Sequence, residues 1–189
     1  MTDPDYGIHP VLKAKLQNVK CVLMDVDGVW TDGGLYFDNK GEEFKKFHVH
    51  DGMGISLLHL GGIETGVITG KKSQIVKDRA QQLKINYVYQ GNDNKLQPLD
   101  DLLNQTEYSD DTLCYIGDDL LDIPILNRVG LAVAVSNACE EAKMAADVVT
   151  EKSGGNGALR ELSELILKAQ NKWLDVLDLL KDPEVHKVQ

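Results

Sequence analysis

Short apolar runs alternate with amphipathic stretches along most of the chain. The apolar runs are rich in β-branched residues and short enough to be strands, and they occupy residues 21–24, 63–68, 87–89, 113–116, 131–135 and 148–149. Between them, apolar positions recur at helical spacing over residues 54–60, 73–83, 96–103, 123–128 and 139–145, and a longer amphipathic stretch covers residues 158–180. This alternation predicts an α/β fold: a Rossmann-like parallel sheet with helices on both faces.

One segment interrupts the alternation. Residues 30–49 have no helical period, and the turn sequence Asp38-Asn39-Lys40-Gly41 lies between two short runs that contain aromatic residues. We expect a β-hairpin that projects from the sheet just after the first strand. Because an isolated hairpin is only marginally stable in water, it is expected to pack against its own domain or against another subunit. Its aromatic side chains favour another subunit.

Length and composition predict a single domain over residues 1–189, with a polar tail from about residue 181. The chain is 42% hydrophobic and 26% charged, as in ordinary globular proteins. Its net charge of −10 argues against a nucleic-acid partner, whose binding depends on cationic side chains. No run approaches the roughly 20 apolar residues of a membrane helix, and the acidic N-terminus does not resemble a signal peptide. We therefore expect a cytoplasmic protein with no membrane partner.

The first predicted strand ends in two carboxylates. Asp25 and Asp27 close the apolar run, and Gly28 marks its exit. In open α/β sheets, ligands bind at the carboxyl ends of the strands, so these charged groups lie where chemistry is usually done. The alternative is structural, with one aspartate capping a helix and the other lying in a turn.

Polar residues follow three further predicted strands. Thr69-Gly70 comes after the second, Lys95 lies in the loop after the third, and Asp118-Asp119 with Asp122 come after the fourth. Each signal is weak alone, since Thr-Gly is commonly a helix cap. The fold would bring all of them to one edge of the sheet, where carboxylates repel by about 1 kcal/mol per pair in water. Oxygen ligands of this kind predict Mg²⁺, and no His/Cys cluster indicates zinc.

The order Asp-x-Asp-Gly-Val, Thr, Lys and Gly-Asp-Asp-x-x-Asp resembles that of the haloacid-dehalogenase (HAD) phosphatase superfamily. Residues 25–33, 47–55, 68–73, 78–79 and 154–161 extend the resemblance to its capless phosphatases of 3-deoxy-D-manno-octulosonate (KDO) 8-phosphate, which serve lipopolysaccharide sugar synthesis. The likeness covers residues 10 to 170, approximately. It implies a capless HAD core and a Mg²⁺-dependent phosphoric monoester hydrolase. It also implies a homotetramer in which hairpins associate and a neighbour closes each site.

Chemistry and resemblance together imply separate roles for the catalytic residues. Asp25 would attack phosphorus and form an aspartyl-phosphate, while Asp27 would give a proton to the leaving oxygen and later take one from water. Thr69 and Lys95 would stabilise the phosphoryl oxygens. The expected metal site comprises the carboxylates of Asp25 and Asp118 and the backbone carbonyl of Asp27, supported by Asp119 and Asp122.

The resemblance also implies the sugar-binding positions, which are Asp27, His48, Val49, His50, Asp51, Gly52, Ser56, Gly70, Lys71, Arg79 and Lys95. Three of them depart from the pattern: His50 and Lys71 stand where arginines are expected, and Ser56 where some relatives are basic. Arginine grips a carboxylate with two parallel hydrogen bonds and lysine offers a point charge, so we expect weaker or rearranged recognition of the substrate carboxylate. The glycine-rich segment 154–157 and Arg160 could join the site or form a plain helix start.

Three alternatives stay open at this point. The nearest is a phosphatase for a nine-carbon acid sugar 9-phosphate of the sialate or deaminoneuraminate type. A receiver-like signalling module also carries carboxylates, Mg²⁺, a threonine and a lysine on a parallel sheet. Asp27 argues against it, because a second carboxylate would shorten the life of a phosphoryl group, and receivers lack the long hairpin. A silent sugar-binding relative is disfavoured because no catalytic position is substituted.

Overall fold

A computed structural model describes residues 6–182 of the chain. Its main sheet is parallel, with the strand order β5-β4-β1-β6-β7-β8. The strands are β1 (Cys21–Met24), β4 (Glu64–Thr69), β5 (Tyr87–Gln90), β6 (Leu113–Gly117), β7 (Leu131–Ala134) and β8 (Val148–Val149). The central strands are buried along their whole length, as their continuous apolar runs indicate. The predicted α/β class is confirmed.

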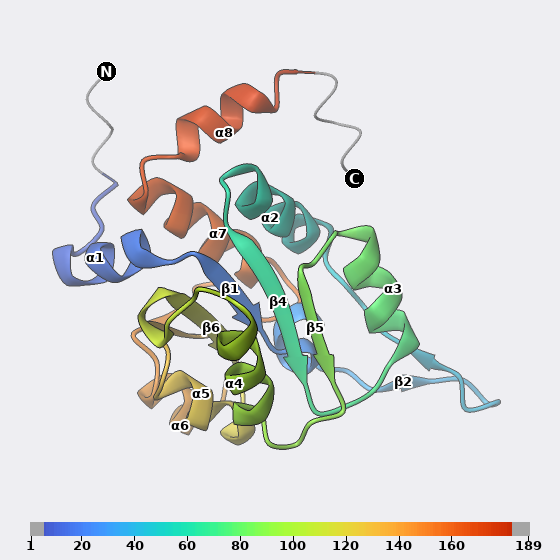
Figure 1. Ribbon diagram of the computed structural model, residues 1–189. Coiled ribbons are helices and arrows are strands. Elements are labelled where there is room, and N and C mark those ends of the chain that lie inside the picture. Colours follow the sequence, from blue (N-terminus) through green and yellow to red (C-terminus); the bar gives the residue numbers. More distant parts are fainter. Residues whose placement is uncertain (1–5, 183–189) are drawn as a thin grey trace.

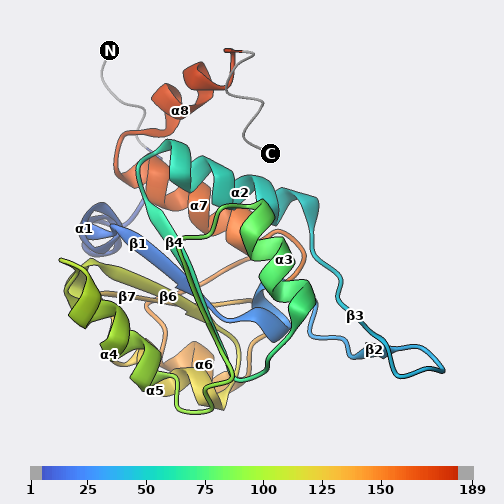
Figure 2. The same cartoon turned by 45° about the vertical axis from the view of Figure 1, so that its right-hand side comes forward.

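Helices cover both faces of this sheet (Figures 1 and 2). One face carries α2 (Val49–Leu60), α3 (Gln74–Gln82) and α7 (Ala158–Ala169), and α7 is in turn contacted by α1 (Pro10–Asn18) and α8 (Trp173–Leu179). The other face carries α4 (Leu96–Gln105), α5 (Ile123–Leu126) and α6 (Glu140–Met144). Across residues 6–182, no helix combines the length and the apolar character that crossing a bilayer requires.

The topology creates a crevice at the centre of the sheet. From β1 the chain moves outward to β4 and β5, then crosses back to β6 and continues outward on the other side. β1 and β6 are therefore neighbours whose connections diverge, and Met24 pairs with Ile116. The space beyond the carboxyl ends of two such strands is where ligands bind in open α/β sheets. Asp25 follows β1 directly and Asp118 follows β6.

The hairpin projects away from the body of the molecule (Figure 1). Its strands β2 (Tyr36–Phe37) and β3 (Glu43–Phe44) pair antiparallel and are much shorter than the segment 30–49 in which the hairpin was expected. Thr31 bridges Phe47 at its base, where the rings of Trp30 and Phe47 lie 4.8 Å apart. Several of its apolar side chains are exposed: Leu35, Tyr36, Phe37 and Phe44.

Two helix boundaries differ from the sequence expectation. α2 begins at Val49 and not at the expected residue 54, and Nδ1 of its N-cap residue His48 accepts the His50 backbone N–H. The amphipathic stretch 158–180 is two helices, because Asn171 adopts φ +59° and ends α7. α1 was not predicted, since Leu16 is its one buried side chain. Most of the expected polar tail lies outside the described residues.

Candidate active site

A tight turn directly after β1 shapes the catalytic edge. The Asp25 N–H donates to the carbonyl of Ile116, and residues Val26–Trp30 then form a kinked turn, which the hydrogen bond from the Thr31 N–H to the Val26 carbonyl closes at 2.9 Å. Gly28 lies within it at φ +98°, and a Cβ there would lie 2.1 Å from Oδ2 of Asp118. Only glycine meets both requirements. The turn can therefore bring the backbone after β1 against the carboxylate after β6.

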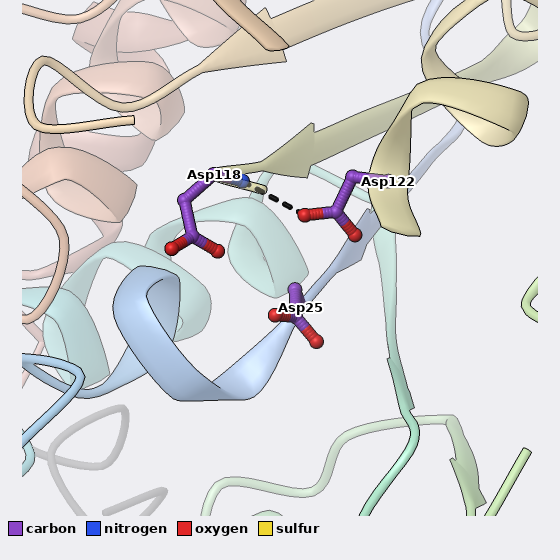
Figure 3. A group of neighbouring side chains, drawn as sticks. All are labelled: Asp25, Asp118 and Asp122. Carbon is purple, nitrogen blue, oxygen red and sulfur yellow. Dashed lines mark hydrogen bonds between the residues drawn. The ribbon is translucent and has the colours of Figure 1, made fainter. Parts of the chain in front are cut away.

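Three carboxylates converge at this edge (Figure 3). Asp25, Asp118 and Asp122 each offer an oxygen within 4.8 Å of the others. Burial raises the pKa of Asp118 to about 7, and the charges of Asp25 and Asp122 add to the effect. Burial likewise raises the pKa of Asp25 to about 6, against the opposing effect of Lys95. Within the part of the chain that the structure describes, Oδ1 of Asp118 is buried without a hydrogen-bond partner. Such a group fits a divalent cation.

Lys95 neutralises part of this charge. Its Nζ lies 2.8 Å from Oδ1 of Asp25 and 2.6 Å from Oδ1 of Asp122, and the side chain is buried. Burial lowers the pKa of Lys95, but the two carboxylates more than offset this and the net shift is upward. The lysine is therefore held as a cation beside Asp25.

Asp122 is committed to holding its neighbours. Its Oδ1 accepts the Tyr115 hydroxyl at 2.6 Å as well as Lys95, and its Oδ2 accepts the backbone N–H groups of Asp118 and Asp119 at 2.8 and 3.1 Å. Asp122 thus fixes Lys95 and the loop, which leaves Asp25 and Asp118 as the better candidates for metal ligands. Tyr115 was not among the predicted residues; its signal was a hydroxyl in an otherwise apolar strand.

Asp27 points to a different set of partners. Its Oδ1 lies 2.5 Å from Nζ of Lys45, and its Oδ2 lies 3.7 Å from Nζ of Lys71. Lys45 comes from the hairpin and was not predicted. Lys71 follows Gly70 and the buried Thr69, which ends β4. The structure therefore brings Lys71 to the predicted acid and base.

A second group of predicted residues lies on α2 and α3. A cavity of about 370 Å³ is lined by Val49, Gly52, Met53, Ser56, Arg79, Gln82 and Leu83. A Cβ on Gly52 would lie 2.7 Å from Nη2 of Arg79, and the Ser56 hydroxyl donates back to the Gly52 carbonyl at 3.3 Å. His50 is exposed on the first turn of α2. The residues that line this cavity form a surface between α2 and α3, called the α2–α3 surface below.

Two predicted residues, Asp51 and Asp119, cap helical turns. Asp51 has no exposed surface, and its two oxygens accept the backbone N–H groups of Gly157 and Arg160, both at 3.1 Å. It caps the start of α7, and with both oxygens occupied its buried side chain has a structural role in this chain. Asp119 is exposed, and its Oδ1 accepts the Leu120 N–H, so it caps the short turn before Asp122.

The glycine-rich segment 154–157 supports the catalytic turn. The Gly155 N–H donates to the carbonyl of Val29 at 2.8 Å, and a Cβ on Gly154 would fall 1.6 Å from the carbonyl oxygen of Gly28. Arg160 pairs with Glu164 at 2.8 Å on α7 itself. Within this chain, the segment packs against the catalytic turn at the start of α7.

Known proteins share this architecture. Residues 63–162 match the family of haloacid dehalogenase-like hydrolases. The 3-deoxy-D-manno-octulosonate 8-phosphate phosphatase of Salmonella typhimurium is 44% identical over 168 residues, 88% of this chain and 89% of that protein. The Escherichia coli K12 enzyme of the same name is 45% identical over 159 residues, 84% of this chain and 85% of its own.

Solved structures of enzymes with the same name have a similar fold. The Yersinia pestis 3-deoxy-D-manno-octulosonate 8-phosphate phosphatase has a TM-score of 0.86 at 40% identity, covering 88% of this chain and 90% of that one. The Moraxella catarrhalis enzyme, solved in complex with magnesium ion, phosphate ion and a KDO molecule, has a TM-score of 0.87 at 39% identity, covering 89% and 97%. This chain belongs to the haloacid dehalogenase-like hydrolases and, within them, to the family of 3-deoxy-D-manno-octulosonate 8-phosphate phosphatases.

Proposed function

We propose that the protein hydrolyses KDO 8-phosphate to KDO and inorganic phosphate through an aspartyl-phosphate on Asp25, in lipopolysaccharide sugar synthesis. The observation that carries the proposal is the edge of the sheet itself. Asp25 contacts a buried Lys95 and faces Asp118, while Asp27, two residues on, has separate partners. One carboxylate can then attack while the other moves a proton. The identity of about 45% with KDO 8-phosphate phosphatases supports the substrate.

The reaction proceeds in two steps, formation of the aspartyl-phosphate and its hydrolysis. An Asp25 oxygen attacks phosphorus, the bond from phosphorus to the sugar oxygen breaks, and that oxygen takes a proton from Asp27. Water then attacks the same phosphorus and gives a proton to Asp27, and the bond to Asp25 breaks to release phosphate. Lys95 and the Thr69 hydroxyl stabilise the phosphoryl oxygens in both steps. Asp122 keeps the Lys95 ammonium in place throughout.

The carboxylates of Asp25 and Asp118 fit Mg²⁺. Both have raised pKa values, and the buried Oδ1 of Asp118 has no hydrogen-bond donor among the described residues. We assign the backbone carbonyl of Asp27 as a third ligand. When bound, the cation would neutralise phosphoryl charge and orient the ester. The magnesium ion in the Moraxella complex supports this choice of metal.

Substrate recognition and assembly complete the proposal. Lys71 lies beside Asp27 and its side chain is 58% exposed, which supports a role in binding the substrate carboxylate. The α2–α3 residues Val49, Gly52, Ser56 and Arg79, with His48 and His50, would contribute from a surface of their own. We propose a homotetramer in which hairpins associate and a neighbour closes the site, which the exposed Leu35 and Phe37 support. A cytoplasmic location follows for an enzyme whose substrate is a multiply charged sugar phosphate.

Phosphate release from KDO 8-phosphate, with Mg²⁺ and with excess chelator, tests this function. We expect turnover that requires the metal and a kcat/KM at least tenfold (about 1.4 kcal/mol) above that for nine-carbon acid sugar 9-phosphates. The departures at His50, Ser56 and Lys71 make those sugars the proper competitors. A preference for a nine-carbon substrate would replace the proposed one and keep the reaction type. A chelator-resistant activity would contradict the metal assignment.

A further inference from the structure

The side chain of Lys45 is enclosed, unlike the apolar side chains of the same hairpin. Its side chain is 2% exposed, whereas that of the adjacent Lys46 is 61% exposed. The Lys45 ammonium contacts Oδ1 of Asp27 at 2.5 Å and Oε1 of Glu43 at 3.2 Å. Burying an ammonium costs free energy unless it is paired, so the hairpin holds this side chain in a defined place.

The two oxygens of Asp27 have unequal surroundings. Oδ1 makes a short, charge-assisted hydrogen bond to the enclosed Lys45. Oδ2 faces Nζ of Lys71 at 3.7 Å, beyond hydrogen-bond distance, and Lys71 is largely exposed. The carboxylate is therefore held by a hydrogen bond at Oδ1, while the Asp27 side chain as a whole is 23% exposed.

The hairpin also contacts the loop after β4. Oε2 of Glu43 accepts the Ser73 hydroxyl at 3.4 Å, while Oε1 of the same carboxylate pairs with Lys45. Contacts thus run from the Ser73 loop through Glu43 and Lys45 to Asp27. Lys45 sits immediately after β3, so its position depends on the hairpin keeping its place.

We infer that Lys45 is a positioning residue for proton transfer: it fixes Oδ1 of Asp27, so that Oδ2 gives the proton to the leaving oxygen and takes it back from water. This inference rests on the proposed function, in which Asp27 is the acid and base. A carboxylate free to rotate would spend much of its time away from the leaving oxygen, and small misplacements of a reacting group are costly in rate.

A comparison of leaving groups tests this role. A sugar or alkyl phosphate needs a proton on the departing oxygen, whereas p-nitrophenolate leaves without one. We expect Lys45→Met to lower kcat/KM about 100-fold for the alkyl leaving group and less than about fivefold for p-nitrophenyl phosphate, the difference being the general-acid contribution. KM should change little. Lys45→Arg, which keeps the charge and the donors, should recover most of the alkyl-ester activity.

Lys46→Met is the matched control, because it removes the neighbouring lysine from the same hairpin and should leave both activities near wild type. Equal losses for the two leaving groups after Lys45→Met would show that Lys45 only braces the hairpin and would overturn the inference. If the Met variant does not fold, Lys45→Gln carries the same comparison. A wild-type enzyme that cleaves aryl and alkyl phosphates but not KDO 8-phosphate would refute the substrate while leaving this test intact.

Discussion

The catalytic edge of the sheet and the α2–α3 surface differ in how completely one chain builds them. At the catalytic edge, Asp122 has donors on both oxygens, and Lys95 has carboxylates on two sides. On the α2–α3 surface, the Ser56 hydroxyl turns back onto its own helix and the buried Nε of Arg79 has no hydrogen-bond partner among the described residues. One chain supplies the partners of the candidate catalytic residues, whereas the candidate recognition residues have polar groups that a substrate or a neighbouring subunit could still contact.

The largest effect is expected at Asp25, the proposed nucleophile. Asp25→Asn keeps the shape of the side chain but removes the oxygen nucleophile, so turnover should fall by on the order of 10⁴ or more. Steady-state phosphate release measures the loss, and acid quenching with radiolabelled substrate should detect no phosphoenzyme. Circular dichroism of the variant should match wild type. Near-normal turnover would show that Asp25 is not the nucleophile and that the edge of the sheet is not the catalytic site.

Asp122 should matter next, through stability as well as rate. Asp122→Ala leaves Lys95 with one carboxylate partner and strips the acceptor from Tyr115, and breaking a buried ion pair costs about 3–5 kcal/mol. Urea unfolding of wild type and variant measures this loss. Asp119→Ala is the control, because Asp119 is exposed and caps one turn, so its cost should be near 1 kcal/mol. Equal costs would mean that the network around Asp122 is not specially coupled.

Substitution of Asp118 should raise the free energy of unfolding at high pH, whereas substitution of Asp122 should lower it. The pKa of Asp118 is about 7 in the folded protein against an ordinary value of 3.8. The native state therefore binds more protons between these values, and the contribution of Asp118 to the free energy of unfolding falls as pH rises from about 4 to about 7. At pH 8 without metal, Asp118→Asn should stabilise the protein by on the order of 1 kcal/mol; near pH 4 the gain should vanish.

Urea unfolding in chelator at pH 8 and at pH 4 checks this sign. Saturating Mg²⁺ should stabilise wild type at pH 8 and leave the variant unchanged, because the cation binds the charged carboxylate. The variant should also lose Mg²⁺-dependent turnover. A destabilised Asp118→Asn protein at pH 8 would show that the carboxylate is compensated by groups other than a metal.

The catalytic edge was predictable from sequence because its residues follow strands of a parallel sheet. Asp25, Lys95 and Asp118 each come directly after or shortly beyond an apolar run, and the fold class alone places such positions together. The roles of Asp25 and Asp27 in catalysis stay predictions, but their distinct partners are now visible.

What escaped prediction depends on contacts between distant segments. Lys45 is enclosed only because the strand that returns from the hairpin tip brings its side chain against Asp27 and Glu43, and nothing in a Lys-Lys pair next to Phe44 marks one lysine as buried. Asp51 caps a helix 106 residues away, so no local pattern reveals it. The first turn of α2 was not predicted because Gly52 and Gly54 weaken the helical pattern. Gly54 is nevertheless required by packing, since a Cβ at this position would lie 2.8 Å from Cα of Arg160.

Substitution of Lys71 tests substrate recognition, with an expected effect of moderate size. Lys71→Arg introduces a bidentate partner for a carboxylate, so KM for KDO 8-phosphate should fall by about threefold to tenfold, within the 1.4 kcal/mol of one added charge-assisted bond. KM for an ester without a carboxylate should not change. Lys72→Arg, at the next position, is the matched control. An equal effect on both esters would place Lys71 on the phosphate and not on the sugar acid.

The smallest change in stability is expected on the hairpin. Phe37 is 62% exposed, so Phe37→Ser should alter the free energy of unfolding of the isolated chain by less than about 0.5 kcal/mol. If hairpins associate, the same substitution removes interface area, and size-exclusion chromatography should show dissociation together with a raised KM. Val11→Ser on α1, where the side chain is 66% exposed, controls for the loss of an exposed apolar group. A monomer that keeps full activity would mean that the α2–α3 surface needs only the substrate to complete it, and the neighbour would have no part in recognition.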